Sequence, residues 1–417
     1  MQQQDLIPHL FRTEFRKITA VLCKYFGIEN IQIAEDIASD TFLSAVDTWT
    51  YRGIPANPTA WLYTVAKNKA KNHLHRENIF SEKIIADIKR SSVNIEEPGI
   101  NLSEQNINDS QLQMLFAVCH PSISTESQIG LALRILCGFG IDEIANAFLS
   151  NRETINKRLS RAKEKLRDEK IRIELPGKTE IEDRLDTVLT TLYLLFSEGY
   201  YSETDDTILR EDLCAEAMRL TYMLIENLPT GQAGEQTNLP KVNALYSLMC
   251  FHSSRFAARK NEKAEMVLYH DQDESLWNQE LIMKGIYFLH EASKGNELSK
   301  YHIEASIGYW HTIKSDSNEK WENILQLYNK LLVIEYSPIA ALNRTYALAK
   351  VKGKEAAIEE AEKLNLTTNH FYFTLLGELY TGLDNKKANQ NFQKAFSLAK
   401  TETDKQTIRK RINELIL

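Results

Sequence analysis

Residues 141–170 read IDEIANAFLSNRETINKRLSRAKEKLRDEK, a stretch with two apolar patterns of helical period around a short polar turn. The first pattern, over residues 141–149, predicts a short helix whose inward side chains are Ile144, Ala145 and Phe148. The second pattern has apolar residues at i, i+4, i+7 and i+11, which are Ile155, Leu159, Ala162 and Leu166. Ser150 and Glu153 have the spacing of a capping box that begins this second helix. Two short helices joined by a tight turn predict a helix-turn-helix.

The outer face of the second helix is basic. In chain order it carries Arg152, Asn156, Lys157, Ser160 and Arg161. Because Arg and Lys bind guanine edges or phosphates and Asn suits adenine, this face predicts a recognition helix for DNA. Glu153 has a simpler interpretation as a helix cap than as an acceptor for cytosine. The alternative for the whole face is an ordinary amphipathic surface helix.

An earlier helix, predicted over residues 34–49, has an acidic face. Its core stripe consists of Ile37, Ala38, Thr41, Phe42, Ala45 and Val46. Nearly opposite, at i, i+4, i+7 and i+11, are Asp36, Asp40, Leu43 and Asp47. An exposed leucine among carboxylates favours docking onto a basic, partly apolar protein surface. The alternative is a solvated acidic face, and a paired-carboxylate active site has less support because no His or glycine loop accompanies it.

The next predicted helix begins at Pro58, with Asn57 as its candidate cap. Its inward residues are Leu62, Val65 and Ala66. Lys67, Asn68, Lys71 and His75 share another face, and Trp61, Asn68 and Asn72 line up at i, i+7 and i+11. Lysines beside asparagines and an aromatic ring match a surface that holds phosphates and stacks unpaired bases. The alternative is a basic solvated face with Trp61 in the core.

From residue 180 onward, helical patterns follow one another with short turns, and the last of them repeat. The best copy has the tetratricopeptide (TPR) positions Phe373, Leu376, Gly377, Tyr380, Ala388, Phe392 and Ala395. An earlier copy has Leu342, Asn343, Tyr346, Ala357, Ala361 and Leu364, and a degenerate one has Trp321, Ile324, Tyr328 and Leu331. Stacked helix hairpins predict an α-solenoid that holds a protein partner.

Two other segments of this region carry polar and aromatic residues of uncertain role. Phe196, Glu198, Tyr200 and Tyr201 either pack within the helices or line a ligand groove. Asp273, in the segment before Trp277, has a simple interpretation as a helix cap. Cys119, His120 and Cys137 lack zinc spacing, so we expect them in a core or a turn.

Length and composition define the class of protein. The chain has 417 residues with only 16 Gly and 9 Pro, which favours an all-α protein of two or three domains. We find no apolar stretch long enough for a transmembrane helix and no export signal at the N-terminus. Five cysteines without CxxC spacing fit reduced thiols, so we expect a cytoplasmic protein with no metal and no cofactor. The sequence has no nucleophile elbow or phosphate loop, so we predict no catalytic residue and no enzyme activity.

Charge is distributed unevenly along the chain. Residues 1–175 hold equal numbers of acidic and basic side chains, so the net charge of −7 belongs to the remainder. Within the first part, basic residues concentrate at 52–76 and 152–172, which suggests two separate contacts with a polyanion.

These motifs resemble those of the extracytoplasmic-function (ECF) sigma factors of RNA polymerase. The second conserved region of that family is similar to residues 33–49 (IAEDIASDTFLSAVDTW) and 57–76 (NPTAWLYTVAKNKAKNHLHR). Its fourth region is similar to residues 138–168. The ECF group with a long TPR-like extension is similar in the later segments 192–202, 210–220, 271–277 and 337–349. The resemblance implies region 2 at 9–77, a linker at 78–109, a region 4 helix-turn-helix at 110–172 and a TPR-like domain at 180–417.

The resemblance also implies partners and site residues. Its partners would be core RNA polymerase, through the β′ clamp and the β flap, and promoter DNA. The residues that would face the clamp helices are Asp36, Asp40 and Leu43. Those at the −10 element would be Trp61, Lys67, Asn68, Lys71 and Asn72, and those at the −35 element would be Arg152, Glu153, Asn156, Lys157 and Arg161.

The sequence departs from the family at Asn151, Arg152 and Glu153, where many members have small or apolar residues. The −35 sequence is therefore not transferable. One alternative function is a helix-turn-helix regulator with a TPR sensor that binds DNA without polymerase. Another is a TPR adaptor or an enzyme with a basic surface. The acidic face around Leu43 argues against the first, because a protein that binds only duplex DNA does not need it.

Overall fold

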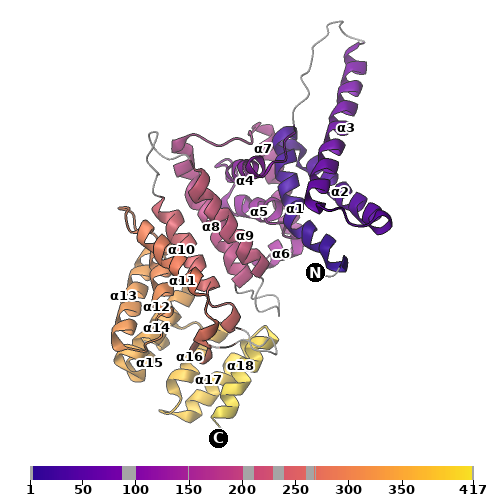
Figure 1. The fold of residues 1–417 in the computed structure, drawn as a ribbon. Coiled ribbons are helices and arrows are strands. Elements are labelled where there is room, and N and C mark those ends of the chain that lie inside the picture. Colours follow the sequence, from indigo (N-terminus) through magenta and orange to yellow (C-terminus); the bar gives the residue numbers. More distant parts are fainter. Residues whose placement is uncertain are drawn as a thin grey trace. The chain divides into compact units, whose positions relative to one another are not determined.

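The computed structural model describes residues 3–86, 100–148, 150–200, 211–228, 239–259, 267 and 269–415. Across these ranges the regular secondary structure is helical and contains no strand, so the all-α prediction is confirmed (Figure 1). The chain forms two compact units, Met1–Leu192 and Tyr193–Leu417. We call them the N-terminal and C-terminal units. The boundary between the units falls inside the helix Lys178–Tyr200, about one third of the helix length before its C-terminal end. The sequence had suggested a boundary near residue 180.

The N-terminal unit is built from α-helices of seven to twenty-nine residues and one short 3-10 helix, η1. They are α1 (Gln3–Phe26), η1 (Ile28–Asn30), α2 (Ile31–Arg52), α3 (Pro58–Ala86), α4 (Glu104–Val118), α5 (Thr125–Ile135), α6 (Ile141–Ala147), α7 (Arg152–Asp168) and the first part of α8 (Lys178–Tyr200). Helix α3 continues past residue 77, and α4 begins before residue 110. Helices therefore occupy both ends of the segment 78–109 that we predicted as a linker.

Helix α1 connects the two segments that the sequence assigned to regions 2 and 4. It packs against α2 on one side and against α4 on the other, and α7 packs against η1. The Arg16 guanidinium donates to the carbonyl oxygens of Cys137 (2.8 Å) and Leu136 (3.4 Å) at the end of α5. Ile18 and Leu22 of α1 are fully buried. Residues 9–77 and 110–172 thus share one compact unit.

The C-terminal unit contains the end of α8 and the remaining helices. They are α9 (Glu211–Asn227), α10 (Pro240–Ser253), η2 (Ala257–Arg259), η3 (Tyr269–Asp271), η4 (Glu274–Leu276), α11 (Gln279–Ala292), α12 (Lys300–His311), α13 (Asn318–Ile334), α14 (Pro338–Lys352), α15 (Lys354–Leu364), α16 (His370–Tyr380), α17 (Asn385–Leu398) and α18 (Glu402–Glu414). Helix α10 packs against α9, α11 and α12. A Cβ at Gly285 of α11 would lie 2.6 Å from the Phe251 ring, so this close approach requires glycine.

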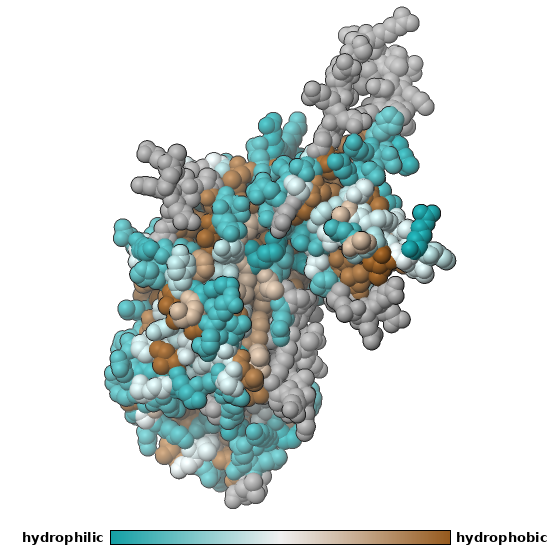
Figure 2. All heavy atoms as spheres, viewed as in Figure 1, coloured by the Kyte–Doolittle hydropathy of each residue, from teal (hydrophilic) through white to brown (hydrophobic). Residues whose placement is uncertain are grey.

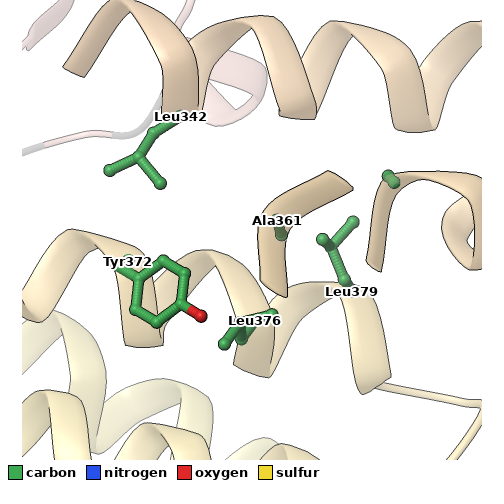
Figure 3. Close-up of a cluster of buried hydrophobic side chains, with 6 residues drawn as sticks. Leu342, Ala361, Tyr372, Leu376 and Leu379 are labelled. Carbon is green, nitrogen blue, oxygen red and sulfur yellow. The ribbon is translucent and has the colours of Figure 1, made fainter. Parts of the chain in front are cut away.

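Consecutive helices pack as pairs over residues 338–398. Figure 3 shows Leu342 of α14, Ala361 of α15 and three residues of α16 (Tyr372, Leu376 and Leu379) around one buried core. Helices α16 and α17 meet where Gly377 faces the Phe392 ring, which a Cβ would approach to 2.6 Å. Ala388, Phe392 and Ala395 are buried, as the repeat pattern predicted. Asp273 caps η4, because its carboxylate accepts from the Ser275 N–H at 2.9 Å.

Candidate functional site

Helix α2 separates a buried stripe from an exposed acidic face. Five of the six predicted core residues are buried, which are Ile37, Ala38, Thr41, Phe42 and Ala45. The sixth, Val46, is 44% exposed, so its placement in the core was wrong. The buried Thr41 hydroxyl donates to the Ile37 carbonyl oxygen at 2.8 Å, which satisfies a polar group inside the core. Gly53 ends the helix at φ 78°, and its N–H donates to the Trp49 carbonyl oxygen.

On the opposite side, Asp36, Asp40 and Asp47 are exposed and Leu43 is 62% exposed. The acidic face therefore carries a solvent-facing leucine between carboxylates, as the helical spacing predicted. Val46 extends the apolar part of this surface. Figure 2 shows other hydrophobic residues at the surface of both units, with hydrophilic residues around them. Leu43 differs from these residues because it lies among negatively charged side chains, and this arrangement suits a basic partner surface with an apolar pocket.

Helix α3 begins as predicted. The Asn57 side chain accepts a hydrogen bond from the Ala60 N–H at 2.9 Å, and Pro58 is the first helical residue. Leu62 and Ala66 are buried, and Val65 is half-buried. The inward face of the helix is thus the predicted one.

The predicted base-binding residues of α3 differ in exposure. Asn68 and Asn72 are exposed, whereas Lys67 and Lys71 are half-buried. The Trp61 ring is half-buried, with its centroid 5.3 Å from that of Trp49 in α2. This edge-to-face pair joins α2 to α3. Trp61 therefore packs against α2 and keeps part of its ring accessible, while its role in stacking on a base stays a prediction.

Helix α7 carries its apolar stripe inward and its polar face outward. Ile155, Leu159, Ala162 and Leu166 are buried. The five candidate DNA-reading residues are all exposed, namely Arg152, Glu153, Asn156, Lys157 and Arg161. Helix α6 precedes α7 and packs against it, and both pack against α5.

Two details at the start of α7 correct the sequence prediction. The N-cap is Asn151, whose side chain accepts from the Thr154 N–H at 2.8 Å, so Ser150 does not form the predicted capping box. Glu153 does not reach back to cap the helix. Its Oε1 lies 2.6 Å from Lys157 Nζ, one turn further on. Arg152 Nη1 lies 3.6 Å from Asp142 Oδ2. Because both ion pairs are exposed, each contributes about 0–1 kcal/mol to folding and leaves its cation accessible.

The sequence analysis missed a basic groove of about 480 Å³ along α7. Its cations are Lys157, Arg158, Arg161 and Lys165, and the turn before α5 supplies the hydroxyls of Ser122 and Ser124. The spacing i, i+4, i+8 of Lys157, Arg161 and Lys165 was a signal for it in the sequence. The phosphates of a nucleic acid backbone suit such a mixture of cations and hydroxyls.

A second basic cavity, of about 840 Å³, lies where the end of α7 meets α1. The basic residues that line it are Lys24, Arg167, Lys170 and Arg172. Lys24 is distant in sequence from the other three, so periodicity did not place it beside them. The N-terminal unit therefore presents cations at both ends of α7 and carboxylates on α2.

The described residues offer no alternative site of a familiar catalytic type. They contain no group of three or more His, Cys, Asp or Glu side chains placed to hold a metal ion. Burial raises the pKa of the Cys119 thiol to about 12, so it is a core residue and not a nucleophile. No helix within the described ranges is long and apolar enough to span a membrane.

Comparison with known proteins gives a family for two parts of the chain. Residues 10–79 match Sigma-70 region 2, and residues 184–293 match a family of unknown function (DUF6596). An uncharacterized protein of Rhizobium meliloti (strain 1021) is 29% identical over 402 residues, which cover 94% of this chain and 92% of that relative. No solved structure matches the chain. Helices α1 to α3 thus form a sigma-70 region 2, which implies binding to core RNA polymerase and a non-enzymatic role as a sigma factor in transcription initiation.

Proposed function

We propose that the chain is an ECF-type sigma factor that directs core RNA polymerase to particular promoters. The single observation that carries the proposal is the acidic face of α2, inside the segment that matches region 2. Asp36 and Asp40 are exposed on the same face as Leu43, which is 62% exposed and opposite a buried stripe. A helix that leaves a leucine in water between carboxylates is suited to a partner surface of opposite charge. The β′ clamp helices of the polymerase are the partner that the resemblance implies.

The proposal assigns promoter opening to α3. Asn68 and Asn72 are exposed on one face, and Lys67 and Lys71 flank it. Trp61 lies on the same helix with part of its ring accessible. Amide groups read base edges, cations hold phosphates and an aromatic ring stacks on an unpaired base. These residue types together support contact with the −10 element in its melted form.

The proposal assigns −35 recognition to α7 as the second helix of a helix-turn-helix. Its support is the exposure of Arg152, Asn156, Lys157 and Arg161 on one face, with Glu153 holding Lys157 in position. The groove along α7 adds Arg158 and Lys165, which suit phosphates beside the major groove. The β flap is the expected polymerase contact of this part of the chain.

The C-terminal unit is assigned as a TPR-like solenoid with a regulatory or scaffolding role. Support comes from the paired helices α14–α15 and α16–α17 and from the close contact of Gly377 with Phe392. A solenoid of this kind presents a surface to a protein partner.

Run-off transcription tests the proposal. Purified core RNA polymerase is combined with the full chain on the DNA upstream of its own coding sequence, and core polymerase alone is the control. We expect a discrete transcript only when the chain is present. The alternative is a regulator that binds DNA without polymerase, and the basic groove of α7 is the observation that favours it. If the chain retards this DNA alone and gives no transcript with core polymerase, the alternative is correct and the sigma assignment fails.

A further inference from the structure

The C-terminal unit contains a cavity of about 660 Å³ that the proposed function does not use. It is enclosed by the end of α8 together with α10, α12, α13 and α14. Its walls are largely aromatic and aliphatic, with Tyr193, Phe196, Tyr200, Tyr269 and Tyr328 as the rings. The volume falls in the range of about 300–1,000 Å³ typical of small-molecule sites. Phe196 and Tyr200 thus line a cavity, one of the two roles that the sequence left open, while Tyr201 lies outside the described residues.

A buried cation lies in the wall of this cavity. Arg255, in the turn after α10, is only 8% exposed, and its guanidinium carbon lies 5.4 Å from the centroid of the Tyr269 ring. Its Nε has no hydrogen-bond partner. Among the described residues no carboxylate lies within ion-pair distance of this guanidinium. A buried charge without an acidic partner is costly, so this part of the cavity wall favours an anionic group beside Arg255.

Two histidines lie beside this arginine in the cavity wall. Burial is the main cause that lowers the pKa of both His252 and His311, and the nearby Arg255 lowers it further. The pKa of His311 falls to about 3. The Nδ1 atom of each ring is buried and has no hydrogen-bond partner within the described part of the chain. Both rings are therefore neutral, and both line the cavity.

Two further buried cations, Lys320 and Arg259, add positive charge near Arg255. Lys320 is 1% exposed and donates to the Tyr269 hydroxyl (3.1 Å) and the Ile313 carbonyl oxygen (2.7 Å). Arg259 is 8% exposed, with its guanidinium carbon 3.9 Å from the Tyr200 ring centroid. The acidic neighbours, Asp316 and Glu274, act on Lys320 and are paired with other lysines at the surface. Counting only the described residues, an excess of positive charge thus remains around Arg255.

The other charged groups of the cavity lie on α12 and at the end of α13. Burial raises the pKa of Glu304 to about 7, and the Tyr193 hydroxyl donates to Glu304 Oε1 at 3.4 Å. Lys300 pairs with Glu335 at 2.9 Å. Lys300 and Glu335 thus satisfy each other, whereas Glu304 Oε2 is buried and has no hydrogen-bond partner among the described residues. A negative ligand charge therefore fits beside Arg255 and not beside Glu304.

We propose that this cavity binds a small organic anion, a carboxylate or a phosphate ester with an aromatic or aliphatic body. The anionic group accepts from the Arg255 guanidinium and from the ring nitrogens of His252 and His311. The body of the ligand packs against Tyr193, Phe196 and Tyr328. This proposal does not depend on promoter recognition, because every residue in it belongs to the C-terminal unit.

The test uses the full chain and three probes of similar size, which are benzoate, phenyl phosphate and the neutral benzamide. Binding is measured by isothermal titration calorimetry and by the shift of the thermal unfolding midpoint. We expect at least one anion to bind and to raise the midpoint by several degrees, with benzamide at least tenfold weaker. Benzoate alone would identify a carboxylate site, and phenyl phosphate alone a phosphate site. Failure of both anions, or equal binding of benzamide, would overturn the proposal.

Matched variants connect the binding to Arg255. We expect Arg255→Met to weaken the bound anion at least tenfold, and Arg255→Lys to retain part of the binding. The control Lys314→Met removes an exposed lysine that pairs with Glu274 outside the cavity lining, and it should bind as the wild type does. Anion binding that survives Arg255→Met unchanged would overturn the assignment. If Arg255→Met does not fold, two other measurements decide the same question. They are the affinity of Arg255→Lys for the anion and the preference of the wild type for the anion over benzamide.

Proton uptake gives an independent readout. An anion in this cavity favours the protonated forms of His252, His311 and Glu304, the last with a pKa of about 7, so binding should take up protons and tighten as the pH falls from 8 to 6. Titration in two buffers of different ionisation enthalpy measures this uptake. Equal apparent enthalpies in the two buffers would place the anion away from the histidines and contradict the proposed pose.

Discussion

The two units of the chain place their charged residues in opposite ways. In the N-terminal unit the charges assigned to function are exposed, on the acidic face of α2 and along the outer face of α7. In the C-terminal unit Arg255 and Lys320 are 8% and 1% exposed and lie among aromatic rings. Exposed charges cost little to fold and are available to macromolecules, whereas buried charges weaken the fold until something pairs with them. The first arrangement suits a docking surface, and the second suits a ligand site.

The same difference predicts how substitutions act. Charge changes on the N-terminal unit should alter binding and leave folding intact. Charge changes in the cavity of the C-terminal unit should alter folding and its pH dependence even without a partner. The predictions below test this contrast, from the largest expected effect to the smallest.

The largest effect concerns the boundary between the units. Residues 178–192 of α8 belong to the N-terminal unit, and their fully or nearly fully buried apolar side chains are Ile181, Val188, Leu189 and Leu192. Arg184 Nη1 also donates to the Phe116 carbonyl oxygen at 3.2 Å. Because each such side chain contributes about 1.5–3 kcal/mol, their loss removes roughly 6 kcal/mol or more, which is comparable with the whole stability of a domain.

We therefore expect a chain that ends at Gly177 to show no cooperative thermal unfolding by circular dichroism. A chain that ends at Tyr200, the end of α8, should unfold cooperatively. If both truncated chains unfolded with equal cooperativity, α8 would not belong to the N-terminal unit, and the contrast between the units would be weakened.

The second prediction is charge reversal on the acidic face of α2. Asp36→Arg with Asp40→Arg should weaken capture of core RNA polymerase by roughly a hundredfold, because like charges placed opposite each other cost several kcal/mol. The control is Glu182→Arg with Asp183→Arg, which makes the same change of charge at two exposed residues of the same unit. Both variants should unfold at the wild-type temperature. Wild-type capture by the α2 variant would exclude this face from the polymerase interface.

The third prediction concerns the buried Glu304. Its pKa of about 7 lies above its usual value of 4.5, so the folded state binds the extra proton between these two pH values. Stability is therefore lost as the pH rises from 4.5 to 7, and at about 1.4 kcal/mol per pH unit the loss approaches 3.5 kcal/mol. Glu304→Gln should regain up to this amount at pH 8 and nothing at pH 4. Urea unfolding at both pH values measures the change.

His311 should give stability the opposite dependence on pH. Its pKa of about 3 lies below its usual value of 6.5, so the unfolded state binds the proton first and stability is lost as the pH falls from 6.5 towards 3.

The control for Glu304→Gln is Glu322→Gln on the exposed face of α13. If both glutamine variants respond alike to pH, the contrast between buried and exposed charge fails.

The sequence predicted the surface sites better than the cavity. Helical periodicity places Asp36, Asp40 and Leu43 on one face because all three belong to one helix. It erred at Val46, which lies at the edge of the stripe, where a shift of one position decides between core and solvent. It also assigned the cap of α7 to Ser150, although the neighbouring Asn151 is an equally good cap and takes that position.

The cavity could not be predicted, because Arg255, His311 and Tyr328 come from elements distant in sequence and meet only in the folded unit. The sequence did single out Phe196 and Tyr200, but it left open whether they pack or line a groove. Periodicity within one helix carries no information about which helices become neighbours. The packing of residues 9–77 and 110–172 into one compact unit was missed for the same reason, since the hydrogen bond from Arg16 to the Cys137 carbonyl oxygen joins α1 to the end of α5.

The smallest effect is expected at Lys157, on the outer face of α7. Its Nζ lies 2.6 Å from Glu153 Oε1 in an exposed ion pair, so Lys157→Ala should change stability by no more than about 1 kcal/mol. If Lys157 reads a base, the substitution should cost roughly 1–3 kcal/mol and relax the preference at one position of the −35 element. If it holds a phosphate, the loss should be similar on every promoter and the salt dependence should weaken.

Glu153→Ala separates these two roles, because it releases the lysine from the partner that positions it. A base-reading Lys157 needs that position, so Glu153→Ala should also relax the preference, whereas a phosphate-binding Lys157 should bind more tightly once the carboxylate is gone. Transcription from a library of −35 variants with core polymerase measures both effects. The control Lys352→Ala removes an exposed lysine at the end of α14 in the C-terminal unit and should change neither. If neither α7 substitution changes transcription from the library, this turn of the helix is not part of the DNA interface. Arg161 and Lys165 would then be the cations that remain in that interface.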